Sequence, residues 1–108
     1  MTAFIPRIVS AMFVFVFALL SLDIAPVQAN NRNAIKEMIV YEAQQSGLKP
    51  SLALAVAKVE SDFQARALSS AGARGVMQIM PATAWGEYGI AAHLLWNPRI
   101  NVRLGLHF

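Results

Sequence analysis

The sequence predicts a mainly α-helical protein with a single small domain. Segments 33–46 and 50–62 repeat apolar residues at the three- and four-residue spacing of a helix face. Prolines and glycines stand at the ends of the helical segments, and no two segments alternate like a convincing pair of strands. A chain of 108 residues has room for one modest hydrophobic core.

The first two helices are predicted from their apolar spacing and from the residues at their ends. Gly47 is placed to end the helix at 33–46. Pro50 is tolerated in the first turn of the second helix, which is expected to run to about Asp62. That second helix is apolar on most sides, so we expect it to be central and buried.

The second half of the chain is expected to be a loop followed by two short helices. Residues 64–75 lose periodicity and gain serine and glycine, whereas 76–80 is a short apolar stretch of uncertain type. Pro81 is expected to start a helix that ends near Gly86 or Gly89, and Asn97-Pro98 is a good start for a last helix. This helix continues apolar to Phe108, and Ile100, Leu104 and Phe108 are expected to lack packing partners; Val102 and Leu106 are its other apolar members.

Glu60 is the candidate catalytic residue. On a helical wheel with about 100° per residue, Val56, Val59 and Phe63 fall within roughly 40° of Leu52, and Glu60 lies at about 80°. A carboxyl on the border of an apolar face is partly desolvated, which raises its pKa toward the range that a general acid needs. The alternative is an ordinary solvated or ion-paired helix glutamate, and periodicity alone does not exclude it.

The N-terminal segment reads as a signal peptide, residues 1–29. Ile8 to Leu22 is almost wholly apolar but short for a membrane span, and Val27-Gln28-Ala29 suits signal peptidase. An uncleaved anchor is the alternative; we expect no stable anchor and an exported protein of the periplasm or cell wall. The chain has no cysteine, and its net charge of +3 is weak evidence for an anionic wall.

A series of motifs then gives the chain a family resemblance. Ala57-x-x-Glu60-Ser61-x-Phe63 precedes Ser69-x-x-Gly72-Ala73-x-Gly75-x-Met77-Gln78-x-Met80-Pro81-Ala82-Thr83-Ala84, and Asn97-Pro98, Asn101 and Gly105 follow. In this order and spacing, residues 52–105 resemble the catalytic core of the soluble lytic transglycosylase family. The resemblance implies a lysozyme-like, mainly helical domain (30–108) that acts on peptidoglycan without a cofactor.

The resemblance also implies roles for single residues. The family's single acid/base maps to Glu60, and its glycan-cleft serine, glutamine and second methionine map to Ser69, Gln78 and Met80. Such enzymes break the β-1,4 bond between N-acetylmuramic acid and N-acetylglucosamine and leave a 1,6-anhydro end. Asp62 lies about 200° around the helix from Glu60, so it is a poor second acid; Glu87 stays open as one.

Several of these residues also have simpler structural explanations. Met77, Ile79 and Met80 are more often core residues, Gln78 needs hydrogen-bond partners if buried, and the glycines permit a tight backbone. Core packing is also the expected role for most of the aromatic residues Trp85, Tyr88 and Trp96, although they could stack on sugars. His93 and His107 lack metal-ligand spacing, and the export signal argues against a nucleic-acid partner for Gly72-Ala73-Arg74-Gly75.

The chain departs from the family pattern at two places. Gln64-Ala65 replaces the usual Asn-Pro, and the Tyr-Asn-x-Gly segment that brings a tyrosine near the acid does not follow. We therefore expect a domain that is incomplete at its C-terminus. The alternative function is a non-catalytic remnant that binds glycan strands or a cell-envelope secretion apparatus.

Signal cleavage gives the first testable prediction. Cleavage after Ala29 should give an exported protein whose N-terminal sequence begins at Asn30. N-terminal sequencing of the exported protein measures this directly. Recovery of the uncut chain in the membrane fraction would instead support the anchor.

Overall fold

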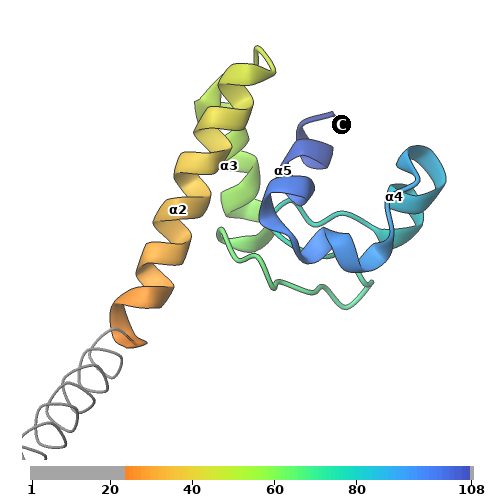
Figure 1. The fold of residues 1–108 in the computed structure, drawn as a ribbon, viewed down its shortest axis with the longest axis horizontal. Coiled ribbons are helices and arrows are strands. Elements are labelled where there is room, and N and C mark those ends of the chain that lie inside the picture. The colour runs from red at the N-terminus through yellow and green to blue at the C-terminus, as the bar shows by residue number, and fades with distance from the viewer. Residues whose placement is uncertain (1–23, 108) are drawn as a thin grey trace, which may run out of the picture. The chain divides into compact units, whose positions relative to one another are not determined.

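The computed structural model describes residues 24–107, with side chains from Asn31 onward (Figure 1). The elements are α2 (Ile24–Gln45), α3 (Pro50–Ser61), α4 (Pro81–Tyr88), a 3₁₀ helix η1 (Ala92–Trp96) and α5 (Pro98–His107). The β-type pairing in this range consists of two isolated bridges, Leu68 to Arg74 and Arg74 to Ile79. The predicted mainly helical class is therefore confirmed.

The chain divides into two compact units, residues 1–31 and 32–108, and the side chains discussed below lie in the second. α2 begins at Ile24, nine residues before the predicted start, and includes Pro26 in its first turn, where proline is tolerated. Most of the predicted signal peptide lies outside the described residues. Among the residues that are described, no helix is both long and apolar enough to cross a membrane.

α3 has the predicted ends, but its buried face is not the predicted one. Pro50 occupies its first turn, and Asp62 caps it in the left-handed conformation with φ 52°. Its buried residues are Ala53, Ala57 and Ser61. Of the predicted core stripe, Phe63 is buried just after the helix, but the three residues on the helix itself are exposed: Leu52 at 59%, Val56 at 43% and Val59 at 84%. Apolar residues recur at helical spacing on both of these faces of α3. The core packs against the face whose side chains are small.

The core gathers buried residues from each helix that the structure describes and from the loop between α3 and α4. Ile39, Val76, Leu95 and Val102 are its largest fully buried apolar side chains. The other members are smaller or lie at its edge: Ile35, Ala43, Ala53, Ala57, Phe63, Met77, Ile79, Ala84 and Leu104. Burial of such side chains contributes roughly 1.5–3 kcal/mol each for the larger ones, so this shared cluster is the main stabilising feature.

α4, η1 and α5 form the C-terminal part of the described chain. α4 starts at Pro81 as predicted and ends at Gly89, whose φ of 65° suits a C-cap. The 3₁₀ helix η1 was not predicted. The Asn97 side-chain oxygen caps α5 as expected, because it accepts hydrogen bonds from the backbone N–H groups of Arg99 (3.0 Å) and Ile100 (3.2 Å).

The expectation that Ile100 and Leu104 of α5 lack packing partners is wrong. Val102 and Leu104 are buried, and Ile100 and Leu106 pack partly buried against the core. Phe108 lies outside the described residues. The exposed apolar stripe of this domain is therefore on α3 rather than on α5.

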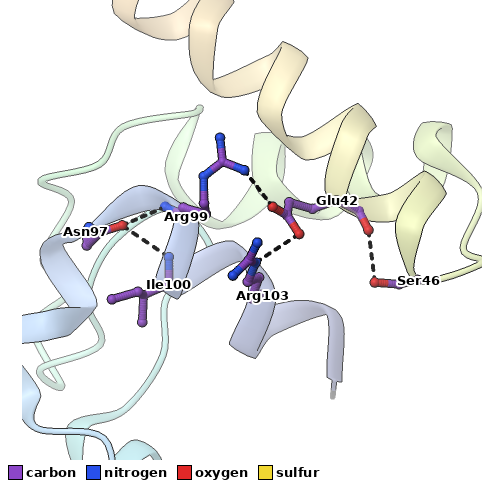
Figure 2. Close-up of polar contacts among 6 residues, drawn as sticks. All are labelled: Glu42, Ser46, Asn97, Arg99, Ile100 and Arg103. Carbon is purple, nitrogen blue, oxygen red and sulfur yellow. Dashed lines mark hydrogen bonds and ion pairs between the residues drawn. The ribbon is translucent and has the colours of Figure 1, made fainter.

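A buried carboxylate joins α2 to α5. Glu42 is 4% exposed, and its two oxygens accept from Arg99 Nη1 at 2.8 Å and Arg103 Nε at 3.0 Å (Figure 2). The hydrogen bond from Arg103 is the largest of the effects that lower the pKa of Glu42; burial alone would raise it. Both arginines are about half exposed at their side chains, so water reaches one side of the cluster.

Replacing Glu42 by Gln should lower the free energy of unfolding at neutral pH by about 2–4 kcal/mol. Because the folded-state pKa of Glu42 is lowered, its contribution is present above the unfolded value of about 4.5 and is lost as pH falls through the folded value. The difference between parent and Glu42→Gln should therefore shrink below pH 4.5. Urea unfolding at several pH values measures it.

Glu37→Gln is the matched control, because Glu37 is an exposed glutamate on the same helix. Its effect should stay within about 0.5 kcal/mol. An equal loss in both variants, or a Glu42→Gln difference that grows in acid, would contradict the proposed role of the buried carboxylate.

Candidate functional site

Glu60 lies in the last turn of α3, one residue before the helix ends at Ser61. Its side chain is exposed, because the face that it borders is the solvent face of α3. The expectation that an apolar surrounding partly desolvates this carboxyl is therefore wrong in the described structure. Its position at the helix end is nevertheless well defined by the next three residues.

Ser61 fixes the end of α3 to the following loop. Its buried hydroxyl donates to the Val76 carbonyl at 2.7 Å and accepts from the backbone N–H of Gln64 at 3.3 Å. Val76 lies two residues before Gln78. This bond therefore connects the helical turn that carries Glu60 to the loop segment that carries Gln78 and Met80. Sequence reasoning paired Ser61 with Glu60 in a motif but gave it no role.

The turn after Ser61 is tight and uncommon for non-glycine residues. Asp62 and Phe63 both have positive φ, at 52° and 61°. Phe63 is nevertheless buried, and the ammonium of Lys36 lies 4.9 Å from its ring centroid. Core packing of Phe63 thus maintains a backbone reversal immediately after the candidate catalytic residue.

Ser69 stabilises a turn within the loop. Its hydroxyl oxygen accepts from the Ala73 N–H at 2.9 Å, and its own N–H donates to the Ala73 carbonyl at 3.0 Å. Gly72, with φ 97°, provides the left-handed conformation inside this turn. The structure therefore gives Ser69 a loop-forming role, and its predicted contact with glycan remains a prediction.

Gln78 is partly buried and bonded to the backbone, as expected for an amide between apolar neighbours. Its Nε2 donates to the carbonyls of Ala67 at 3.1 Å and Gly75 at 3.0 Å. These bonds accompany a positive φ of 52° at Gln78 itself. Since both bonds use the amide nitrogen, the amide oxygen is the atom that can accept a hydrogen bond from a sugar hydroxyl.

Met80 and two aromatic residues are more exposed than core packing requires. Met80 is 40% exposed just before α4, whereas Met77 and Ile79 are buried as expected. Trp85 is 66% exposed and Tyr88 is 39% exposed, so the expected core role is wrong for both. Exposed rings on a short helix after the loop are suited to stacking on sugars.

A buried amide positions the central part of the loop. Asn101 on α5 is fully buried; its oxygen accepts from the Met77 N–H at 2.7 Å, and its nitrogen donates to the carbonyls of Arg74 (2.8 Å) and Leu95 (3.0 Å). A Cβ on Gly75 would meet this amide and would lie 2.7 Å from the Leu95 carbonyl oxygen. Asn101 was recognised as a motif residue, and its burial in an apolar helix is the feature that reveals its role.

Gly105 explains a second motif position. A Cβ at Gly105 would lie 2.5 Å from the Cβ and Cγ of Met77, so the loop packs directly on the α5 backbone. The loop is thus bound to α3 through Ser61 and to α5 through Asn101 and Gly105. Among the residues that the structure describes, no group of three His, Cys, Asp or Glu side chains could hold a metal ion.

Comparisons with known proteins agree with this arrangement. Residues 37–108 match the family model of the transglycosylase SLT domain. The structure resembles the crystal structure of an inactive mutant of the lytic transglycosylase Slt from Pseudomonas aeruginosa, with a TM-score of 0.56 and 37% sequence identity. That match covers 64% of this chain and 12% of the Pseudomonas chain, so this chain spans a small part of that protein's length.

Two glycines of the loop provide a test of its packing. Gly72 and Gly75 both have positive φ, but space is open around Gly72 and filled around Gly75. Gly72→Ala should therefore cost about 1 kcal/mol of stability from backbone strain, whereas Gly75→Ala should cost about 3 kcal/mol or more. Urea unfolding of both variants measures the difference, and equal costs would contradict the tight contact with Asn101.

Proposed function

Because this chain belongs to the transglycosylase SLT family, we propose that it cleaves the β-1,4 bond between N-acetylmuramic acid and N-acetylglucosamine in peptidoglycan. The observation that supports this best is the Glu60-Ser61 pair at the end of α3, tied through the Ser61–Val76 hydrogen bond to the loop of Gln78 and Met80. This hydrogen bond connects the backbone that carries the acid to the loop that carries the two candidate sugar contacts.

In the proposed reaction Glu60 acts twice. It first donates its proton to the glycosidic oxygen, so that the N-acetylglucosamine side leaves as an alcohol. The carboxylate then accepts the proton of the muramic C6 hydroxyl as that oxygen bonds to the anomeric carbon. The product is a 1,6-anhydro end, no water enters, and the acid is regenerated.

The ion pairs of Asp62 and Glu42 make both acids poor alternatives to Glu60 as the proton donor. The Asp62 carboxylate pairs with Lys58 and, at 3.3 Å, with Arg32, while Glu42 is bound by two arginines. The hydrogen bond from Lys58 is the main cause that lowers the pKa of Asp62. A carboxyl stabilised as an anion is a poor proton donor at neutral pH. The resembling Slt structure is described as that of an inactive mutant in which a glutamate is replaced by glutamine, which also favours a catalytic glutamate here.

We further propose that the chain acts outside the cytoplasm, after removal of residues 1–29, where its substrate lies. The exposure of Glu60 favours a second candidate, a domain that binds glycan or a secretion-apparatus partner without cleavage. A solvated carboxyl lacks the apolar surroundings that prepare a general acid.

Release of muropeptides by the parent and by Glu60→Gln together distinguishes these two functions. We expect release of soluble muropeptides from purified sacculi to fall by at least about 10²- to 10⁴-fold, because the variant retains the shape but cannot donate the proton. Glu87→Gln is the control and should retain activity within about twofold. Strong loss in Glu87→Gln would indicate a two-carboxyl hydrolase instead.

Mass spectrometry of the same digest identifies the product. Anhydro ends are lighter than hydrolysed reducing ends by one water, so their dominance would support the proposed attack by the C6 hydroxyl. A parent chain that binds sacculi but releases nothing would support the non-catalytic candidate.

A further inference from the structure

α4 carries an exposed tryptophan that the packing of the domain does not account for. Trp85 is 66% exposed, although tryptophan is highly buried on average. Within the described residues its ring makes no ring–ring or cation–π contact, and its indole N–H donates to no acceptor. Trp96 differs, because the Arg74 guanidinium lies 5.2 Å from its ring centroid. Trp85 therefore presents an open ring face and a hydrogen-bond donor to solvent.

The surface around Trp85 leaves this ring accessible. Ala82 lies three residues before Trp85 and Gly89 four residues after it, so small residues flank the ring along the helix. A Cβ built on Gly86 or on Gly89 would meet nothing within 4 Å. Tyr88, which is 39% exposed, follows three residues after Trp85, and such neighbours have Cβ atoms about 5–6 Å apart. A flat ligand can therefore lie on the Trp85 ring and extend toward Tyr88.

The size of this surface fits a sugar ring better than a protein partner. An aromatic side chain of this size offers about 150–250 Å² for burial, whereas a stable protein interface buries about 800 Å² on each partner. Trp85 and Tyr88 together fall short of that area. A pyranose ring exposes C–H groups on its faces and polar groups at its edge. These groups match the face of an aromatic ring and the donor of the indole.

The charges of α4 favour a glycan over a membrane surface. A tryptophan that anchors a helix to anionic lipid accompanies Lys or Arg residues on the polar face of that helix. α4 reads Pro-Ala-Thr-Ala-Trp-Gly-Glu-Tyr, so Glu87 is its charged residue and it has no basic one. Anionic lipid would repel this carboxylate, whereas the hydroxyl and acetamide groups of a glycan can donate hydrogen bonds to it.

We propose that Trp85, with Tyr88 beside it, stacks on a sugar ring of the β-1,4-linked glycan strand, an inference that rests on the proposed function. A strand is a long polymer, so a sugar far from the cleaved bond can occupy this site, and no nearness to Glu60 is required. The site adds affinity for the strand without acting on the cleaved bond. Its ligand is the N-acetylated sugar ring rather than the peptide stem, so neutral oligomers of N-acetylglucosamine are a suitable probe.

Tryptophan fluorescence tests the site directly, because the full chain has two tryptophans. In the full chain carrying Glu60→Gln and Trp96→Phe, the emission comes from Trp85. Oligomers of N-acetylglucosamine should reduce acrylamide quenching of this emission by about twofold, because a stacked sugar shields one of the two ring faces. Dextran, a neutral polymer of glucose, should leave the quenching unchanged. If Trp96→Phe melts earlier by circular dichroism, the difference in emission between Glu60→Gln alone and Glu60→Gln with Trp85→Phe measures the same shielding.

Calorimetric affinities for the same oligomers, in the Glu60→Gln background, separate ring stacking from general apolar contact. Trp85→Ala should weaken binding by about tenfold, the order of magnitude that one stacked ring contributes. Trp85→Phe keeps a flat ring and should stay within about threefold of the parent affinity. Tyr41→Ala is the matched control, because Tyr41 is an aromatic residue of α2 with 52% exposure. It should leave the affinity within about twofold.

The possible outcomes separate the two proposals. Equal affinities of the parent and Trp85→Ala, or equal effects of Trp85→Ala and Tyr41→Ala, would overturn the stacking site and leave the proposed function intact. Equal shielding by dextran would also overturn it, as would shielding by phosphatidylglycerol vesicles instead of oligomers, or by a rise in protein concentration alone. A parent that releases no muropeptides from sacculi, but whose oligomer affinity falls with Trp85→Ala, would refute the proposed cleavage and support the stacking site.

Discussion

The buried Asn101 amide is the interaction on which the rest of the site depends. Its three hydrogen bonds satisfy backbone groups of Arg74, Met77 and Leu95, which come from a loop and from the end of η1. The loop contributes Val76, Met77 and Ile79 to the core, and unpaired backbone groups in this buried region would be costly. The Asn101 amide pairs three such groups, on condition that residue 75 has no side chain.

Two further interactions connect the helices and the loop around Asn101. Ser61 connects the end of α3 to the loop two residues before Gln78, and Glu42 connects α2 to α5 through two arginines. α5 is therefore the element that joins the parts, since it carries Asn101, Gly105 and both arginines. This accounts for its burial, although some of its apolar residues were expected to lack partners.

The site combines a well-positioned backbone with an exposed acid. Glu60 follows α3 to its last turn, and Ser61, Asp62 and Phe63 determine where the chain goes next. The carboxyl itself faces solvent together with Leu52, Val56 and Val59. Bound glycan would change that environment, because it would exclude water from the carboxyl and strengthen its interactions.

The sequence by itself determined the helical class, the ends of α3 and α4, the Asn97 cap, and the motif that identifies the family. These features depend on local chemistry: a proline's missing N–H, a glycine's positive φ, a side chain that bonds its own backbone. Only the tertiary structure decided which face of α3 is buried, because Ala53 and Ala57 have the same helical spacing as larger apolar residues on the other side. It also decided the exposure of Glu60 and the role of Asn101. Both depend on contacts with residues distant in sequence. The periodicity of one helix carries no information about those contacts.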